Sequence, residues 1–415
     1  MIAARHSDEA PVAGIAATGA TRTRWQAIVV GAGPAGAAAA WRLAAAGIRT
    51  LLVDRHDLPR GKVCGCCLSS RALRELHDLS AAALPTAALP LAAVRLAHRG
   101  GHTRIPLPAG RVVSRECLDA HLVRQAIAAG CEWLPGLHVT AVEESPCGAS
   151  ITLHGRHATA AEHGPLRIRA EYALIATGLA DHIRIAGHDT PGAERLVAAG
   201  SRIGIGGVLP ATAADLPAGE LVMAVGREGY CGIVRLEDGR LDVAAALDRD
   251  AVTRATDPAD AVARLLASAA CSLPRLVPRG DAIRATAFRA TPPLTRRAAL
   301  VAGVARRILR LGDAAGYVEP FTGEGMGWAL ASARLAAQAI ATADGLRVPA
   351  DAACRYVADH DREFATLHAR CRLVAGSLRR PALVAAAVAG ARMMPWAARR
   401  LVPALLGTVD AGGGR

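Results

Sequence analysis

A glycine-rich turn close to the N-terminus constrains the fold more than any other feature. The sequence Gly31-Ala32-Gly33-Pro34-Ala35-Gly36 directly follows an apolar run at residues 26–30 that predicts a buried strand. Residues 34–46 have the composition of a helix that ends at Gly47, and a second apolar strand follows at residues 50–53. A strand, helix and strand joined this tightly form a right-handed unit of a parallel sheet. We therefore predict an α/β fold with a Rossmann-like parallel sheet.

The same turn predicts a dinucleotide site, because its glycines match the G-x-G-x-x-G pattern. Gly31 allows the tight turn, Gly33 lets backbone N–H groups approach a pyrophosphate, and Gly36 lets helix and strand pack closely. The helix N-terminus adds a partial positive charge that favours a phosphate. Asp54 lies 18 residues after Gly36, at the tip of the second strand, where its carboxylate would accept hydrogen bonds from a ribose hydroxyl.

Composition excludes several classes of protein. The chain has 415 residues, of which 52% are hydrophobic, and this predicts a globular protein of roughly two to three domains. The net charge of +13 comes from arginine, with Lys62 as the only lysine, and aromatic residues make up 3%. Nucleic-acid grooves usually combine clustered basic residues with stacking aromatics, so we expect no nucleic-acid partner. No uninterrupted apolar run approaches the roughly 20 residues that span a bilayer.

The N-terminal residues and the cysteines predict the compartment. Residues 1–24 mix charged residues with Ala and Gly and lack the apolar core of a secretory signal, so we interpret them as a flexible extension. The ten cysteines of such a chain are expected to be reduced thiols in the cytoplasm. Cys64, Cys66 and Cys67 have the density of a metal site, but a closed site needs four ligands and no second paired-Cys motif occurs. We expect no bound metal.

A second glycine-rich region, about 280 residues further on, indicates which dinucleotide is bound. Gly312-Asp313-Ala314-Ala315-Gly316 follows a short predicted strand, and Pro320-Phe321-Thr322-Gly323-Glu324-Gly325 precedes a helix predicted from about residue 323 to 341. A carboxylate at a strand end can hold a ribityl chain, and a glycine-rich helix start can place N–H groups beside a flavin ring or pyrophosphate. Over residues 27–341 the chain resembles the group of FAD enzymes that includes aromatic hydroxylases, flavin halogenases and geranylgeranyl reductases.

Within that group the chain most resembles the geranylgeranyl reductases. Their Lys-x-Cys-Gly element is present as Lys62-Val63-Cys64-Gly65, and hydroxylases usually carry His where Gly316 stands. The resemblance implies that Cys64 lies near the flavin ring, where a thiol donates a proton or shapes the pocket; the alternative is a small buried residue. It also implies that Arg115 faces the flavin phosphates and ribityl chain; the alternative is a surface cap on the helix that follows.

The glycine motifs and the family resemblance together predict which residues form the site. Cys64 is the expected catalytic residue. The expected FAD-binding residues are Gly31, Ala32, Gly33, Pro34, Ala35, Gly36, Asp54, Arg55, Lys62, Arg115, Gly178, Gly312, Asp313, Gly323, Glu324, Gly325 and Met326.

The resemblance also implies a division into domains. Residues 91–108 and 203–247 alternate apolar and polar residues as antiparallel strands do, which predicts a second sheet inserted into the first domain. The expected units are a flexible extension (1–24), a discontinuous FAD-binding domain (25–90, 111–180 and 300–345), a substrate domain (91–110 and 181–299) and a helical C-terminal segment (346–415).

Two departures from the family pattern leave the reaction open. Reductases of prenyl chains typically carry Tyr-x-Trp-x-Phe-Pro, but residues 230–235 read Tyr-Cys-Gly-Ile-Val-Arg, and the tryptophan pair of halogenases is absent. We expect an FAD-dependent oxidoreductase that reduces carbon–carbon double bonds in a lipophilic substrate, with NAD(P)H or another reductant as electron donor. The alternatives are a monooxygenase of aromatic or polyketide-like substrates and a non-catalytic, membrane-associated flavin-binding module. The oligomeric state stays open.

The C-terminal segment has two interpretations. From Arg370 to Leu406, arginines occur at intervals between apolar residues. The apolar stretch at 381–391 is too short to span a bilayer. It forms either an amphipathic helix at the surface of an anionic membrane or a helix packed on the FAD-binding domain. The first interpretation predicts a peripheral membrane location for a cytoplasmic enzyme.

Overall fold

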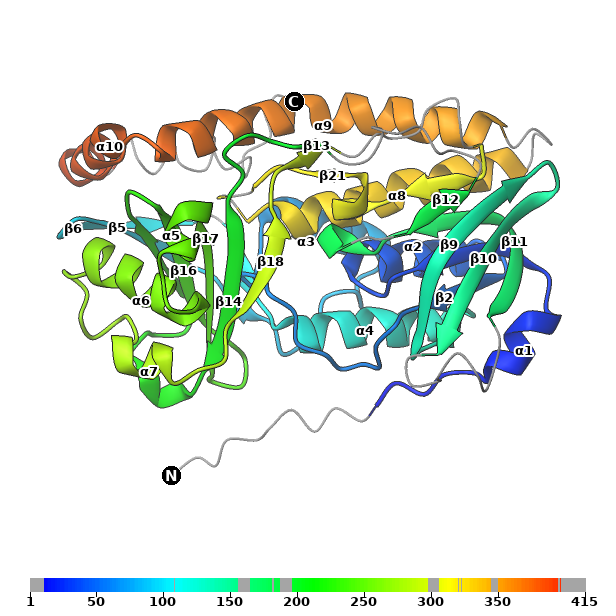
Figure 1. Cartoon of the computed structure of the whole chain (residues 1–415), viewed down its shortest axis with the longest axis horizontal. Coiled ribbons are helices and arrows are strands. Elements are labelled where there is room, and N and C mark those ends of the chain that lie inside the picture. Colours follow the sequence, from blue (N-terminus) through cyan, green and yellow to red (C-terminus); the bar gives the residue numbers. More distant parts are fainter. Residues whose placement is uncertain are drawn as a thin grey trace.

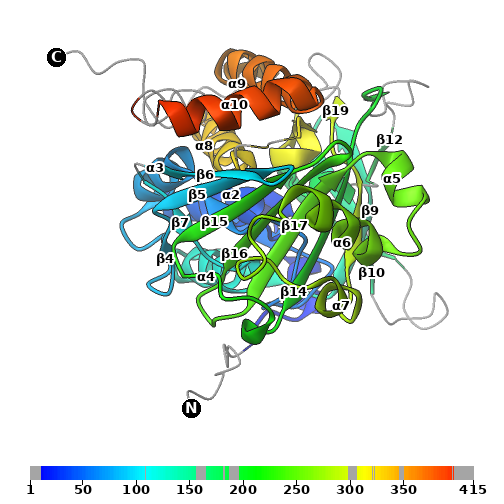
Figure 2. The same ribbon diagram turned by 90° about the vertical axis from the view of Figure 1, so that its left-hand side faces the viewer.

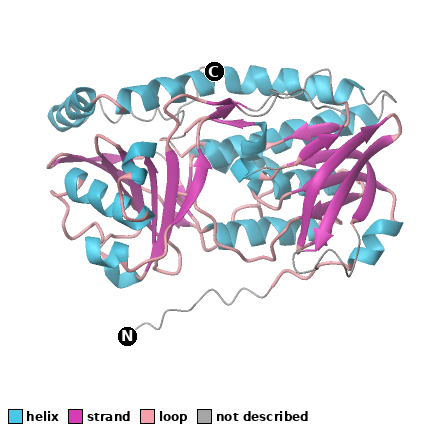
Figure 3. Cartoon of the chain, in the orientation of Figure 1, coloured by secondary structure: helices cyan, strands magenta, loops and turns pink. Residues whose placement is uncertain are grey.

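The computed structural model describes residues 11–107, 109–155, 165–180, 183–186, 196–297, 306–319, 321, 323–344, 350–394 and 396. Two sheets lie at opposite ends of the molecule, and a long helix crosses above both (Figure 1). Figure 3 shows the helices that separate and flank the two sheets. The predicted α/β architecture is confirmed.

The first sheet has a parallel centre, as the glycine-rich turn predicts. Its strands are β1 (Trp25–Val30), β2 (Thr50–Val53), β8 (Glu132–Leu134), β9 (Leu137–Ser145), β10 (Gly148–Gly155), β11 (Leu166–Ile175), β12 (Arg184–Ala186) and β20 (Ile308–Arg310). They run in the order β12-β9-β10-β11-β1-β2-β8, and β20 pairs with β11. β2, β1, β11 and β20 are mutually parallel neighbours. Their apolar runs are buried on both faces, which is typical of a parallel sheet covered on both sides.

Helices pack closely on one face of this sheet. They are α2 (Pro34–Ala45), α3 (Ser70–Leu79), α4 (Arg115–Ala128) and α8 (Gly325–Asp344). α2 contacts α4 and α8, and nearly all of its residues are buried. Because most of these residues are Ala or Gly, the neighbouring backbones can approach closely.

The described part of the predicted extension packs on the first sheet instead of projecting into solvent. Residues 17–22 form α1 (Ala17–Arg22), and the Trp25 indole donates to the Ala20 carbonyl at 2.9 Å. Ile15 N donates to the Trp133 carbonyl at 2.7 Å. Ala20 is fully buried, so residues 11–24 contribute to the core, and residues 1–10 lie outside the described part of the chain.

The second sheet is mostly antiparallel and combines two distant segments. Its strands are β5 (Ala93–His98), β6 (Gly101–Pro106), β14 (Ile203–Leu209), β15 (Glu220–Val225), β16 (Gly229–Arg235), β17 (Leu241–Leu247) and β18 (Arg289–Pro293). β5 joins the later strands by pairing in parallel with β15. α5 (Arg249–Thr253), α6 (Pro258–Ala269) and α7 (Gly280–Arg284) lie on its outer side, and α6 supplies most of the helical residues of that core (Figure 2). The boundary expected at residue 181 differs in one respect, because β12 pairs with β9 of the first sheet.

Short strands also form two small sheets of three strands each. They are β3 (Cys67–Leu68), β4 (Leu89–Pro90) and β7 (Arg111–Val112) in one group, and β13 (Leu196–Val197), β19 (Arg296–Arg297) and β21 (Gly316–Tyr317) in another.

The described C-terminal residues are helical, as predicted. α9 (Ala350–Leu378) runs over both sheets, and α10 (Pro381–Met393) turns away from it by 98° and lies against β5 and β6 (Figures 1 and 2). No described helix is by itself both long and apolar enough to cross a bilayer, whereas α9 and α10 together meet that criterion as a bent pair. Residues 395 and 397–415 lie outside the described part of the chain.

Candidate active site

A large cavity lies between the two sheets and extends to the C-terminal helices. Its volume is about 1310 Å³, above the roughly 300–1,000 Å³ typical of small-molecule sites. The first sheet, the second sheet, α9 and α10 all contribute to its walls. The cavity therefore has room for a dinucleotide and for part of a second molecule.

The polar end of the cavity lies where four parallel strands end. Gly31 follows β1, Asp54 follows β2, Gly178 lies three residues after β11, and Gly312 lies two residues after β20. Ala176 N donates to the Val30 carbonyl at 2.8 Å and thus joins two of these ends. Parallel strands present their carboxyl ends at one edge, so motifs about 280 residues apart meet here.

The three glycines of the first turn have different surroundings. A Cβ at Gly36 would lie 1.8 Å from the Gly31 carbonyl oxygen, and a Cβ at Gly31 would lie 2.5 Å from the Ala176 carbonyl oxygen. Both positions therefore require glycine for packing. A Cβ at Gly33 would meet only the Arg115 Nη2, at 3.4 Å. The N-terminus of α2 thus opens onto the cavity, as the binding of a pyrophosphate requires.

Asp54 is a buried and ionised carboxylate at this edge. It accepts hydrogen bonds from Ala32 N at 2.7 Å and His56 N at 2.9 Å, and it pairs with Arg60 at 3.2 Å. Burial opposes ionisation, but the hydrogen bond from His56 and the charge of Arg60 outweigh it and lower the pKa of Asp54 strongly. The carboxylate therefore holds the glycine turn in shape as well as facing the cavity.

Arg115 is part of the cavity wall, which excludes the alternative of a surface cap. Its side chain is 6% exposed, and it donates to both carboxylate oxygens of Asp119 at 2.8 and 2.7 Å. Such a bidentate pair fixes the plane of the guanidinium. Burial would lower the pKa of Arg115, but Asp119 raises it, so the charge is permanent.

Cys64 lies in the cavity wall between the polar and apolar ends. A hydrogen bond from the Cys66 thiol and then the charge of Arg115 outweigh burial and lower the pKa of Cys64 to about 5. The hydrogen bond with Cys64 and then burial raise the pKa of Cys66 far above its usual range. Cys66 is thus the protonated member of the pair, and its Sγ donates to the Cys64 carbonyl oxygen at 3.8 Å. Among the described residues, no group of three His, Cys, Asp or Glu side chains is arranged to hold a metal ion.

Behind this thiol pair lies Asp242, which the sequence analysis missed. It is 4% exposed on β17, and its Oδ2 has no hydrogen-bond partner. Burial first, and the neighbouring Cys64 second, raise its pKa well above the usual range, so its carboxyl is neutral. A single acid inside the apolar strand Leu241-Asp242-Val243 was the available signal.

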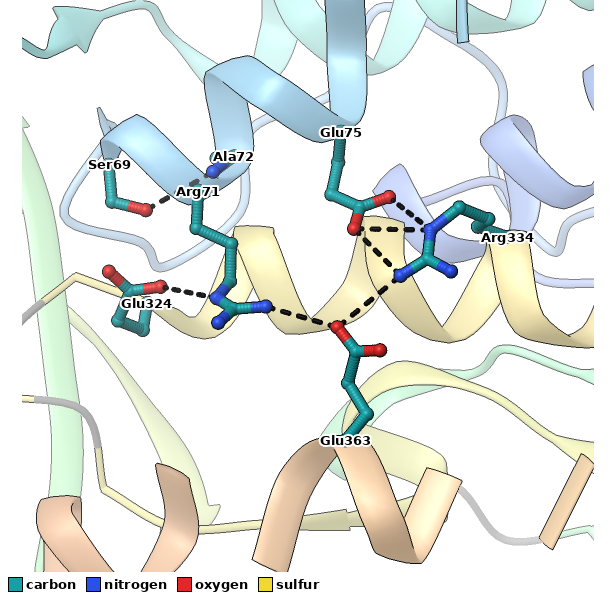
Figure 4. Close-up of polar contacts among 7 residues, drawn as sticks. All are labelled: Ser69, Arg71, Ala72, Glu75, Glu324, Arg334 and Glu363. Atoms are coloured by element: carbon teal, nitrogen blue, oxygen red, sulfur yellow. Dashed lines mark hydrogen bonds and ion pairs between the residues drawn. The ribbon is translucent and has the colours of Figure 1, made fainter. Parts of the chain in front are cut away.

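Glu324 does not lie in the cavity wall, contrary to the sequence prediction. Its buried side chain points toward Arg71 of α3, whose Nε is 3.8 Å away (Figure 4). Burial raises the pKa of Glu324 to about 7, although Arg71 opposes this shift. Arg71 also pairs with Glu363 at 3.1 Å, so the Glu324 position belongs to the contacts between α3, α8 and α9. Gly323 and Gly325 on either side of Glu324 do line the cavity, so the backbone of this motif faces the cavity while the Glu324 side chain does not.

Most of the other predicted residues lie together at the polar end. The cavity is lined by Gly31, Gly33, Pro34, Ala35, Asp54, Arg55, Lys62, Cys64, Arg115, Gly178, Gly312, Asp313, Gly323, Gly325 and Met326. Ala32 and Gly36 lie behind this wall, where Ala32 bonds Asp54 and Gly36 packs on Gly31. Lys62 and Asp313 are buried groups of opposite charge that interact with each other. Burial lowers the pKa of Lys62 and raises the pKa of Asp313, and the charge of each group opposes the shift of the other.

The opposite end of the cavity is apolar. Side chains of the second sheet line it, including Val94, Leu96, Leu221, Met223, Tyr230 and Leu294. Tyr230 packs edge-on against Phe321 at 4.9 Å between ring centroids, and the buried guanidinium of Arg202 lies 5.5 Å from the Tyr230 ring. Leu378 and Val384 close this end from α9 and α10.

Comparison with known proteins assigns the family. Residues 24–347 match the FAD binding domain family. The chain is 28% identical to the menaquinone reductase of Mycobacterium tuberculosis over 353 residues, covering 79% of this chain and 80% of the relative. It is 27% identical to the chloroplastic geranylgeranyl diphosphate reductase of Oryza sativa over 376 residues, covering 82% and 72%.

Solved structures share the fold at lower identity. The myxobacterial chondrochloren halogenase, an FAD-dependent halogenase, superposes with a TM-score of 0.71 at 19% identity, covering 92% of each chain. A geranylgeranyl bacteriochlorophyll reductase-like protein from Thermoplasma acidophilum gives a TM-score of 0.67 at 17% identity, covering 86% of this chain and 88% of that one. Together with the family match over most of its length, this shows that the chain belongs to the FAD binding domain family of FAD-dependent oxidoreductases.

Proposed function

We propose that this flavoprotein reduces a carbon–carbon double bond in a lipophilic substrate, such as a prenyl or other lipid-like chain. The observation that carries the proposal is a single cavity that joins a nucleotide-type strand edge to an apolar chamber, with Cys64 between them. Two relatives that match most of this chain are named as reductases, which supports reduction over hydroxylation.

The residues at the polar end fit FAD, and each of them would hold a different part of the cofactor. The open N-terminus of α2 at Gly33 would hold the pyrophosphate, Asp54 the ribose, and Arg115 the phosphates and ribityl chain. Asp313 would hold the ribityl hydroxyls, and the start of α8 at Gly325 would face the flavin ring. When bound and reduced by NAD(P)H or another reductant, FAD supplies the two electrons and one hydrogen of the reaction as a hydride.

Saturation of the double bond also requires a proton, which the chain supplies through its thiols. Both thiols of the pair line the cavity, but Cys64 is the more exposed of the two, so its sulfur is the atom that passes a proton to the substrate carbon. The proton comes from Cys66, which holds it at neutral pH, and the neutral carboxyl of Asp242 replaces it. While Cys64 is deprotonated, the positive charge of Arg115 stabilises its thiolate.

The apolar chamber orients the substrate and excludes water. Met223, Leu221 and Leu294 bury hydrocarbon, which stabilises binding by about 25 cal/mol per Å² of apolar surface. Gly232 of β16 lines the chamber, and a Cβ there would be in van der Waals contact with Leu221 at 3.4 Å and Met223 at 3.5 Å, so glycine leaves room that a larger side chain would fill. In the Tyr-x-Trp-x-Phe-Pro pattern typical of prenyl-chain reductases, Trp occupies the position of Gly232. The chamber of this protein therefore accepts a bulkier substrate chain at that point.

The test is the mass of the product. The FAD-loaded protein is given NADPH or dithionite and a panel of polyprenyl lipids and aromatic compounds, and products are identified by mass spectrometry. The proposal predicts a gain of two hydrogens without oxygen. A gain of one oxygen would assign a monooxygenase, and a flavin that cannot be reduced and reoxidised would indicate a non-catalytic binding module.

A further inference from the structure

α10 is unusual because it is apolar on both of its faces. Residues 381–391 contain no charged or hydroxyl side chain, yet about half of them are exposed to solvent. Surface helices of globular proteins normally present a polar face to water, and a helix that is apolar all round is normally covered. We therefore expect the outward side of α10 to be covered by a binding partner.

The inner side of α10 already has one. Val384 and Val388 are each 4% exposed, and Val388 contacts the backbone region of Gly101 on β6. Val384 belongs to the apolar cluster that includes Met223 and Tyr230 in the cavity wall. This part of the packed-helix interpretation holds, except that α10 covers the substrate sheet and not the FAD-binding sheet.

The outer face of α10 consists of Ala382, Ala386, Ala389 and Met393, which share one side of the helix at its 3.6-residue period. All four are exposed, and Met393 is 83% exposed. Leu373 of α9 is 70% exposed and also lines the cavity, and so does the exposed Ala387 of α10, so the cavity reaches the surface at these two helices.

Positive charge borders the outer face at both ends. Arg380 caps the start of α10 and Arg392 lies in its last turn, and both are exposed. Arg379 pairs with Asp248 at 3.2 Å and fixes the junction of the two helices on the second sheet. Beyond the helix, Trp396 is 66% exposed, and Trp is the side chain that best fits the boundary between water and hydrocarbon.

We propose that the outer face of α10 docks on the surface of an anionic lipid bilayer and that the substrate enters the cavity from the bilayer beside Leu373. An apolar face bordered by arginines and an indole matches the headgroup layer, where each arginine adds attraction to anionic lipid. A protein partner of similar apolarity would not require the bordering positive charge. The direction of substrate entry rests on the proposed function, whereas the docking itself does not.

The experiment compares two identical substitutions on exposed helix alanines. Ala386→Glu places a carboxylate on the outer face, and Ala267→Glu places one on α6, on the outer side of the second sheet. The full FAD-loaded chain and both variants are sedimented with phosphatidylcholine vesicles that contain or lack phosphatidylglycerol. We expect the parent to bind the anionic vesicles, Ala386→Glu to bind at least about tenfold more weakly, and Ala267→Glu to bind as the parent does. Arg392→Gln should lose about fivefold on anionic vesicles only.

Three results would overturn the docking proposal: no binding by the parent at low salt, equal binding by Ala386→Glu, or equal loss in both glutamate variants. Sedimentation velocity without vesicles adds a check, because a dimer that Ala386→Glu dissociates would assign the face to a second copy of the chain.

Turnover of a short, water-soluble alkene by the same proteins separates the two proposals. If Ala386→Glu loses vesicle binding but still turns over the soluble alkene, the result supports docking by this face. Vesicle binding by the parent without any product would retain docking and reject the reductase.

Discussion

At its polar end the cavity is lined by backbone turns at the ends of parallel strands, whereas at its apolar end it is lined by side chains of the antiparallel sheet and of α9 and α10. The turns need glycine at fixed positions, because Gly31 and Gly36 have backbone atoms where a Cβ would stand. The apolar wall only needs hydrocarbon of suitable volume, and Gly232 leaves space there. The polar end can therefore vary little while the apolar end can change its substrate.

The largest expected effect separates two glycines of the same turn. Gly36→Ala should destabilise the fold by about 3 kcal/mol or more, because its Cβ would lie 1.8 Å from the Gly31 carbonyl oxygen. Gly33→Val should keep the fold and lose FAD, because that side chain would occupy only the open space at the start of α2. Urea unfolding and the yellow absorbance of the purified proteins measure both effects. Full flavin occupancy in folded Gly33→Val would show that the cofactor is placed wrongly.

The second prediction concerns the boundary between the two ends. Cys64→Ala should retain FAD and lower kcat about 100-fold, since a positioned proton donor contributes on that order. Cys67→Ala is the matched control, because burial raises the pKa of that neighbouring thiol and leaves it protonated. If both variants lose activity equally, the role of Cys64 is structural.

The state of the thiol pair can be measured without turnover. Because the hydrogen bond from Cys66 is the main reason that the pKa of Cys64 is about 5, alkylation of Cys64 by iodoacetamide should reach half its maximal rate near that pH. In Cys66→Ala the midpoint should move toward the ordinary thiol value of about 8.5. A midpoint that stays in place would contradict the proton sharing.

The fourth prediction tests whether the Glu324 side chain belongs to the polar or the apolar end of the cavity. Its pKa is raised to about 7, so the folded protein holds a proton that the unfolded chain releases near pH 4.5, and stability must fall as the pH rises between these values. Glu324→Gln cannot ionise and should be more stable than the parent by about 3 kcal/mol above pH 7, with no difference below pH 4.5. Denaturant unfolding at both pH values provides the comparison, and a loss of FAD in this variant would return Glu324 to the cofactor site.

The smallest expected effect lies at the apolar end. Gly232→Trp should leave FAD binding unchanged and lower kcat/KM for long-chain substrates about tenfold relative to short ones, because the indole would fill space next to Leu221 and Met223. Steady-state kinetics with a chain-length series measures this ratio. An unchanged ratio would mean that the substrate does not occupy this chamber.

The two ends also differ in how far their structure could be predicted from the sequence. Gly31 to Gly36, Asp54 and Gly312-Asp313 were identified because turns and strand ends demand particular residue types at fixed spacing. Asp242 and the Val384 contact were missed, since a buried acid on β17 and a helix folded back over β5 depend on tertiary packing that no local pattern records. Glu324 was misplaced for a related reason: its motif fixes the backbone at the start of α8, but its side chain follows the packing of α3.

The most direct test of the proposed function is anaerobic reoxidation of the reduced protein. The FAD-loaded chain is reduced with a stoichiometric amount of dithionite, mixed with a polyprenyl substrate in the absence of oxygen, and followed at the flavin absorbance. The proposed function predicts that the yellow colour returns at the rate at which the saturated product forms, and that Cys64→Ala slows both together. Reoxidation that requires oxygen, with oxygen found in the product, would contradict it.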